Sequence, residues 1–72
     1  MKTLKTIQIE IAGKKLKLEY NIVGSGQHPK ILLFVNGIEW MRVNSFNFKS
    51  DFDFELNFAK QELVNGSYKM FI

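Results

Sequence analysis

The chain has 72 residues, a formal net charge of +3 and a hydrophobic fraction of 46%, with seven phenylalanines and no cysteine. This length is that of one domain, residues 1–72, and the missing thiols exclude disulfides and cysteine-ligated zinc. The composition argues against disorder, and no apolar run approaches the roughly 18 residues that cross a bilayer, so we expect a cytoplasmic protein without a membrane partner.

The first 22 residues predict a β-hairpin, because their apolar side chains alternate with polar ones. With Gly13-Lys14 as a two-residue turn, three apolar pairs and one ion pair fall into register. The predicted pairs are Ile11 with Leu16, Ile9 with Leu18, Ile7 with Tyr20, and Glu10 with Lys17.

A second hairpin is predicted around Asn36-Gly37, a dipeptide that strongly favours a tight turn between strands. It follows a glycine- and proline-containing loop over residues 23–29 and a strand over residues 30–35 that is apolar on both faces. The turn is expected to pair Val35 with Ile38, Leu33 with Trp40, and Leu32 with Met41.

Residues 46–58 can be interpreted in two ways. Phenylalanine or leucine occupies nearly every even position, which predicts a strand, or two strands with a kink near Ser50. In the helical alternative Phe52, Leu56, Ala59 and Leu63 share one face, whereas Phe54 and Phe58 point into water. The strand interpretation is favoured because it buries every phenylalanine.

The remaining residues close the predicted fold. Asn65-Gly66 predicts a last hairpin, although it also resembles a helix C-cap, and residues 59–64 fit either a bulged strand or one short helical turn. The expected fold class is therefore all-β, a small antiparallel meander of six to seven strands forming a curved sheet or a small barrel.

The residues offer little for catalysis. His28 is the one histidine, and it lies in the glycine- and proline-containing loop, while no serine sits in a nucleophile-elbow motif. Asp51, Asp53, Glu55 and Glu62 have part of a calcium-loop spacing, but Leu56 stands where that loop needs glycine. We expect no enzyme, no catalytic residue, no metal and no cofactor.

Basic residues concentrate in the first part of the chain. Residues 1–30 hold six lysines against two glutamates, whereas residues 31–72 are close to neutral. A lysine cluster at the tip of the first hairpin could contact a polyanion if aromatic side chains were exposed beside it. The candidate contact residues are Lys14, Lys15, Lys17, Tyr20 and Trp40.

These patterns favour a non-enzymatic accessory module that binds a protein partner and is itself a homodimer, since so short a chain covers its apolar surface poorly. A phage or mobile-element inhibitor that occupies a surface of a host macromolecule has this kind of build. The alternative is a nucleic-acid-binding small β-barrel that uses the lysine-rich first hairpin.

Overall fold

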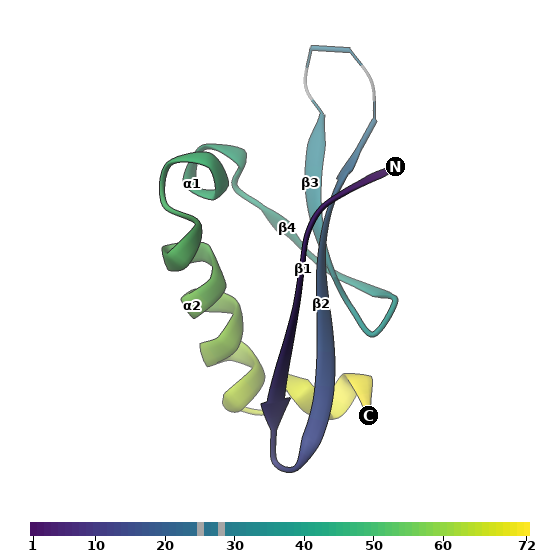
Figure 1. Cartoon of the computed structure of the whole chain (residues 1–72), viewed down its shortest axis with the longest axis vertical. Helices are drawn as coiled ribbons and strands as arrows, with labels where there is room; N and C mark the ends of the chain where they lie inside the picture. The colour runs from purple at the N-terminus through teal and green to yellow at the C-terminus, as the bar shows by residue number, and fades with distance from the viewer. Residues whose placement is uncertain (25, 28) are drawn as a thin grey trace.

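The computed structural model describes residues 1–24, 26–27 and 29–72, so His28 and part of the predicted loop over residues 23–29 fall outside the described residues. Four antiparallel strands form one open sheet in chain order, namely β1 (Lys2–Ile11), β2 (Lys14–Val23), β3 (Lys30–Val35) and β4 (Ile38–Val43). The chain continues into two α-helices and a 3-10 helix, namely α1 (Ser45–Ser50), α2 (Phe52–Val64) and η1 (Ser67–Phe71). Figure 1 shows α1 and α2 on one side of the strands, with η1 near the β1–β2 turn.

The antiparallel meander is confirmed for residues 2–43, but the all-β class and the count of six to seven strands are wrong. The predicted strand over residues 46–58 is helical, in α1 and α2, and residues 59–64 belong to the same α2 helix. Asn65-Gly66 does not form a hairpin: Asn65 ends α2, and Gly66, at a φ of 135°, leads into η1.

Side-chain caps explain why residues 45–64 become helical. The Asn44 side chain accepts a hydrogen bond from the backbone N–H of Asn47, and the Asp51 carboxylate accepts one from Phe54. Each satisfies a backbone donor that a helix start leaves unpaired. The carboxylates of Asp53 and Glu55 lie in the first turn of α2, where the helix dipole favours negative charge.

The β1–β2 hairpin forms as predicted, but its turn is Ala12-Gly13 rather than Gly13-Lys14. Both turn residues have positive φ, 53° and 75°, as a type I′ turn requires. Ile9 therefore faces Leu16 and Ile7 faces Leu18, which shifts each predicted partner by two residues. A shift of two keeps every side chain on its face, so the alternating pattern could not distinguish the two registers.

The Asn36-Gly37 turn is confirmed, and Val35 faces Ile38 as predicted. Farther from the turn the register slips, because Phe34 faces Glu39 while Leu33 faces Met41. Trp40 is the extra residue of this β-bulge, so its predicted pairing with Leu33 is wrong. The predicted pairing of Leu32 with Met41 is wrong for the same reason, because Leu32 faces Arg42.

The core lies between the sheet and the helices. The side chains with essentially no exposed surface come from β2 and β3 and from α2, and they include Leu16, Leu18, Leu33, Val35 and Leu63. Three rings extend this core toward α1: Tyr20, Phe48 and Phe52 pack with centroid separations of 5.1–5.4 Å.

Within the described chain, no helix has the length and apolarity to cross a membrane.

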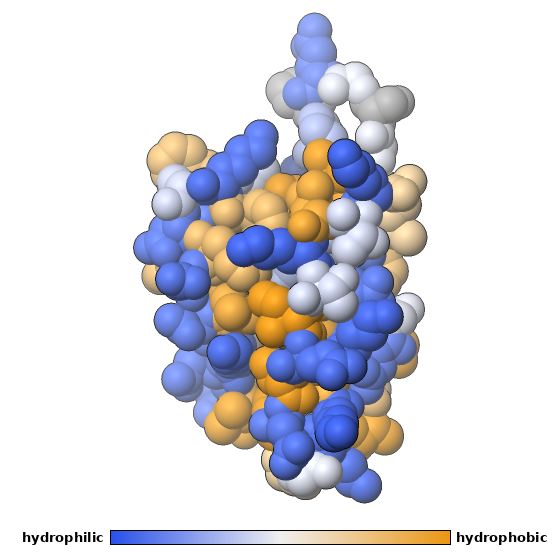
Figure 2. Space-filling model, in the orientation of Figure 1, coloured by the Kyte–Doolittle hydropathy of each residue, from blue (hydrophilic) through white to orange (hydrophobic). Residues whose placement is uncertain are grey.

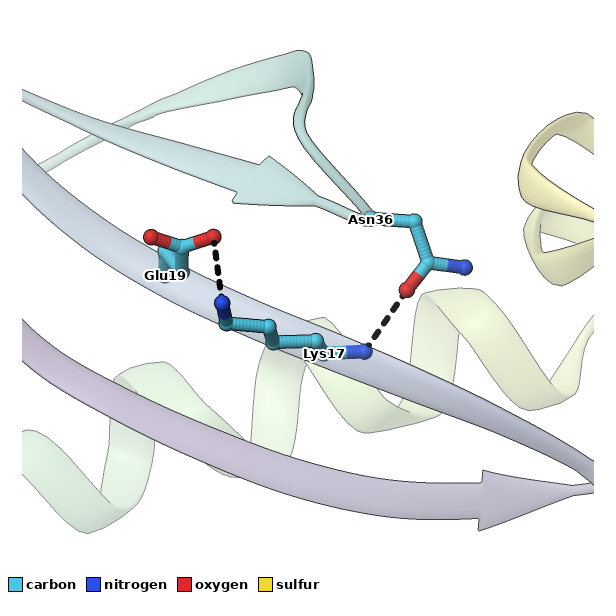
Figure 3. A network of polar contacts seen from close by, with 3 residues as sticks. All are labelled: Lys17, Glu19 and Asn36. Atoms are coloured by element: carbon cyan, nitrogen blue, oxygen red, sulfur yellow. Dashed lines mark hydrogen bonds and ion pairs between the residues drawn. The ribbon is translucent and has the colours of Figure 1, made fainter.

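Asn36 joins the sheet to the C-terminal segment. Its backbone φ is 51°, its side-chain oxygen accepts a hydrogen bond from the Lys17 N–H at 2.9 Å, and its amide donates to the Phe71 carbonyl at 3.1 Å. Figure 3 shows the bond between its side-chain oxygen and the Lys17 N–H. The Asn36 N–H also donates to the Lys17 carbonyl at 2.9 Å, so each residue donates one hydrogen bond to the other. One residue thus shapes the β3–β4 turn and connects it to β2 and η1.

Replacing Asn36 by aspartate is expected to lower the free energy of unfolding by about 1–2 kcal/mol, because the donor to Phe71 is lost while the acceptor and the tolerance of positive φ remain. Alanine at the same position should cost more, since both side-chain hydrogen bonds disappear. Urea unfolding measures both effects. Asn57→Asp, on the exposed side of α2, is the control and should stay within about 0.5 kcal/mol of the parent. Equal midpoints for Asn36→Asp and the parent would contradict the role of the Phe71 contact.

Candidate functional site

The lysines of the first hairpin do not form a single basic face. Lys14 faces Ile11 across the hairpin, while Lys15 faces Glu10 and Lys17 faces Gln8. Since neighbouring side chains alternate between the faces of a sheet, Lys15 and Lys17 share one face and Lys14 lies on the other. The Lys17 ammonium also lies 3.5 Å from the Glu19 carboxylate (Figure 3). This positive charge is therefore divided and partly neutralised.

The two aromatic residues proposed to stack beside these lysines are packed into the fold instead. Tyr20 has no exposed surface and lies between Phe48 and Phe52. Trp40 is half-buried and packs edge-on against Phe71, with a centroid separation of 5.7 Å. The prediction of Tyr20 as an exposed stacking residue is therefore wrong, and Trp40 exposes only part of its side chain to solvent.

Exposed phenylalanines on the helices are a feature that the favoured strand interpretation missed. Phe46 of α1 is 74% exposed, and Phe54 and Phe58 of α2 are 58% and 49% exposed. Phe54 and Phe58 are four residues apart, so they are neighbours on one side of the helix. Ala59 and Leu63 mark the buried side, about half a turn away. The helix thus presents one apolar row to the sheet and a second one to solvent.

Acidic side chains accompany this aromatic surface, which we call the phenylalanine surface and define as Phe46, Phe54 and Phe58. The α2 helix carries Asp53, Glu55 and Glu62 against a single lysine, Lys60. On the helical repeat, Glu62 lies on the flank next to Phe58. The phenylalanine surface is therefore apolar at its centre and acidic along one border.

A basic hollow lies at the end of the sheet near α1. Lys30, Arg42 and Ser45 line a hollow of about 380 Å³, and an adjoining one of about 270 Å³ adds Lys49 and Gln27. No carboxylate from the described residues lines either hollow. The sequence pattern gives no sign of this cluster, because its cations are spread over 20 residues and meet only through the fold.

Residues 1–24, 26–27 and 29–72 hold no group of three histidine, aspartate or glutamate side chains that could bind a metal ion. No protein-family model matches this chain, and comparisons with curated proteins and with solved structures find no match either. Its function is therefore inferred from its own residues.

The buried Tyr20 gives the fold a specific sensitivity to alkali. Burial, and secondarily the charge of Glu55, raises the pKa of Tyr20 from 10.0 to about 12. Because the folded protein holds this proton more tightly than the unfolded chain, the stability that Tyr20 contributes is complete below pH 10 and is lost as the pH rises toward 12. The rise of the pKa from 10.0 to about 12 corresponds to roughly 3 kcal/mol in the free energy of unfolding.

Tyr20→Phe should unfold at the same urea concentration as the parent at pH 7, or at a higher one, because the hydroxyl has no hydrogen-bond partner among the described residues. Between pH 10 and 12 the parent should lose more stability than the variant. The two proteins differ only at this residue, so the difference between their stability curves isolates Tyr20. Parallel stability curves over this range would show that Tyr20 keeps an ordinary pKa.

Proposed function

We propose that this protein is a non-enzymatic module that acts by binding another protein through its phenylalanine surface. The observation that supports the proposal is the exposure of Phe46, Phe54 and Phe58 on a chain whose core is complete without them. Scattered exposed apolar residues are ordinary, but two adjacent phenylalanines on a helix, with a third on the preceding helix, favour an interaction surface.

The energetics of this surface favour a partner that provides a groove. Complete burial of one phenylalanine side chain is worth about 1.5–3 kcal/mol. Phe54 and Phe58 have the i, i+4 spacing by which an amphipathic helix inserts anchors into an apolar groove. The acidic residues of α2 favour a partner whose groove has lysine or arginine at its rim.

A protein that works in this way needs no catalytic residues, because it acts by covering a surface of its partner. Small accessory proteins from a phage or mobile element that inhibit a host enzyme would fit this mode, and we propose that the chain belongs to that functional class. The support for this step is its size and binding surface rather than any motif.

Replacing both Phe54 and Phe58 by aspartate should abolish partner binding without unfolding the domain, since both side chains lie away from the core. If each is a binding anchor worth about 2 kcal/mol, the affinity for the purified partner should fall at least several-hundred-fold. The partner is first identified by pull-down from the native host with the parent protein, and titration calorimetry then compares the variants. Ile38→Asp is the matched control, because Ile38 is similarly exposed, at 51%, on the distant β3–β4 turn. Parent-like affinity of a folded double variant would refute the proposal.

Polyanion binding is a second candidate function, favoured by the basic hollow rather than by the predicted hairpin cluster. Lys30, Arg42 and Lys49 form no ion pair within the described chain, and Arg42 has the planar donors suited to phosphate. The buried Tyr20 and the Lys17–Glu19 pair leave the hairpin less suited to a nucleic-acid backbone.

Replacing Lys14, Lys15 and Lys17 together by alanine should leave partner binding unchanged and reduce solubility, because these lysines are expected to be a solvated edge. Oligonucleotide titrations across a salt series test the alternative. Each lost phosphate contact would flatten the log–log salt dependence by about 0.7–0.9. If the parent binds, the same titration of Arg42→Ala/Lys49→Ala locates the contact. Salt-sensitive micromolar binding by the parent that disappears in the triple variant would instead establish the first hairpin as the nucleic-acid site.

A further inference from the structure

The outer edge of β1 is an unpaired sheet edge with a regular stretch of backbone. Among the described residues β1 pairs only with β2, and its register is regular from Lys5 to Ile11. Ile11 and Lys14 flank a two-residue turn and therefore exchange both backbone hydrogen bonds, and the pattern then alternates along the strand. The N–H and C=O groups of Thr6, Gln8 and Glu10 consequently point away from β2, toward the open edge.

Apolar side chains run along the same edge. Ile7, Ile9 and Ile11 are only half-buried although they pack against the core. Between this row and α2 lies a shallow groove of about 210 Å³, lined by Ile9, Glu10, Ile11, Lys60 and Val64. Figure 2 shows an apolar band along the middle of the molecule, where Figure 1 draws β1, bordered on both sides by hydrophilic side chains.

Most of the usual protections of an edge strand lie at the start of β1. Charged residues and bulges discourage strand addition, and here the bulge at Leu4 and the lysines at positions 2 and 5 all precede Thr6. The Lys5 ammonium is moreover turned toward the helix, 4.0 Å from the centre of the Phe52 ring. From Thr6 to Ile11 there is no lysine, proline or bulge, and Glu10 is the one charged residue.

We propose that this edge binds β1 of a second copy of the chain, antiparallel and about a twofold axis at Gln8, so that two sheets join into one. This register aligns the regular Lys5–Ile11 segment with itself. Ile7 then faces Ile9 of the second copy, Glu10 faces Thr6 of the second copy, and the outward backbone groups meet as hydrogen-bonded pairs. No like charges stand directly opposite, so the segment is complementary to itself, as a twofold interface requires.

A second copy fits this edge better than an unrelated strand does, because its own Ile7 and Ile9 meet the isoleucine row of the first copy in the proposed register. The groove beside Val64 can receive the inward side chains of the added strand. The phenylalanine surface lies on the side of α2 away from the sheet and takes no part in this contact. The proposal is therefore independent of the proposed protein-binding function, and either can fail without the other.

Gln8→Pro tests the proposal through the backbone. Proline removes the outward N–H of Gln8 but no hydrogen bond to β2, because Gln8 and Lys17 form a non-hydrogen-bonded pair. Light scattering should give the parent and Gln8→Ala twice the 8.4 kDa of one chain, and Gln8→Pro the mass of one chain. Circular dichroism confirms that the proline variant is folded. A monomeric parent at 100 μM, or a folded Gln8→Pro that remains a dimer, would overturn the proposal.

Gln8→Cys provides a second test that does not depend on the proline variant folding. At the twofold axis the two Gln8 Cα atoms would lie about 5.5 Å apart, within disulfide range, and the chain has no other cysteine. Mild oxidation should convert most of this variant to a covalent dimer, whereas Asn57→Cys on α2 should stay monomeric on a denaturing gel. Phe54→Asp/Phe58→Asp should remain a dimer by light scattering. Equal cross-linking of the two cysteine variants, or loss of the dimer in the phenylalanine variant, would place the self-association elsewhere.

Discussion

The hydrogen bonds of Asn36 are the constraint on which the arrangement of this small fold depends. The residue takes a left-handed conformation at a tight turn, and its side chain bonds β2 on one side and η1 on the other. The bond to the Phe71 carbonyl holds the Phe71 ring against Trp40. This aromatic pair is separate from the rings of Tyr20, Phe48 and Phe52. A chain of this size has few layers of packing, so one polar side chain that connects three elements has a large share in the fold.

The α2 helix explains why the protein has surface to offer a partner. Its buried row, with Ala59 and Leu63, is enough to cover the sheet, and its second row, Phe54 and Phe58, has nothing to cover. Local capping by Asn44 and Asp51 and packing of the inner row stabilise the helix despite the outer phenylalanines. Exposed aromatics that the fold does not need are more readily explained by binding than by stability.

Two separate apolar surfaces, one along the edge of β1 and one on the solvent side of α2, suggest a division of roles. The β1 edge has unpaired backbone groups and a self-complementary sequence, and these suit association between copies. The phenylalanine surface has side-chain anchors bordered by carboxylates, and these suit a groove on another protein. A dimer formed through β1 would carry two phenylalanine surfaces and could bind a partner bivalently.

The local pattern of the sequence determined the hairpins. Alternation predicted β1 and β2, and a short apolar run predicted β3. Asn36-Gly37 predicted the turn into β4, whose first pair, Val35 with Ile38, is the one observed. The pattern could not distinguish a turn at Gly13-Lys14 from the observed turn at Ala12-Gly13, because a register shift of two residues leaves every side chain on the same face of the hairpin. Lys15 and Lys17 share a face in either register, and the observed turn adds only that Lys14 belongs to β2 and lies on the other face.

Residues 46–58 show what local pattern could not decide. Phenylalanines at alternate positions satisfy a strand, while Phe52, Leu56, Ala59 and Leu63 satisfy a helix, and the sequence holds both periods at once. The strand interpretation buries every phenylalanine of this segment, whereas the helical alternative predicts that Phe54 and Phe58 face solvent. Only the tertiary structure could choose, because the sheet accepts a single apolar row, and that choice left the two phenylalanines in water and enclosed Tyr20.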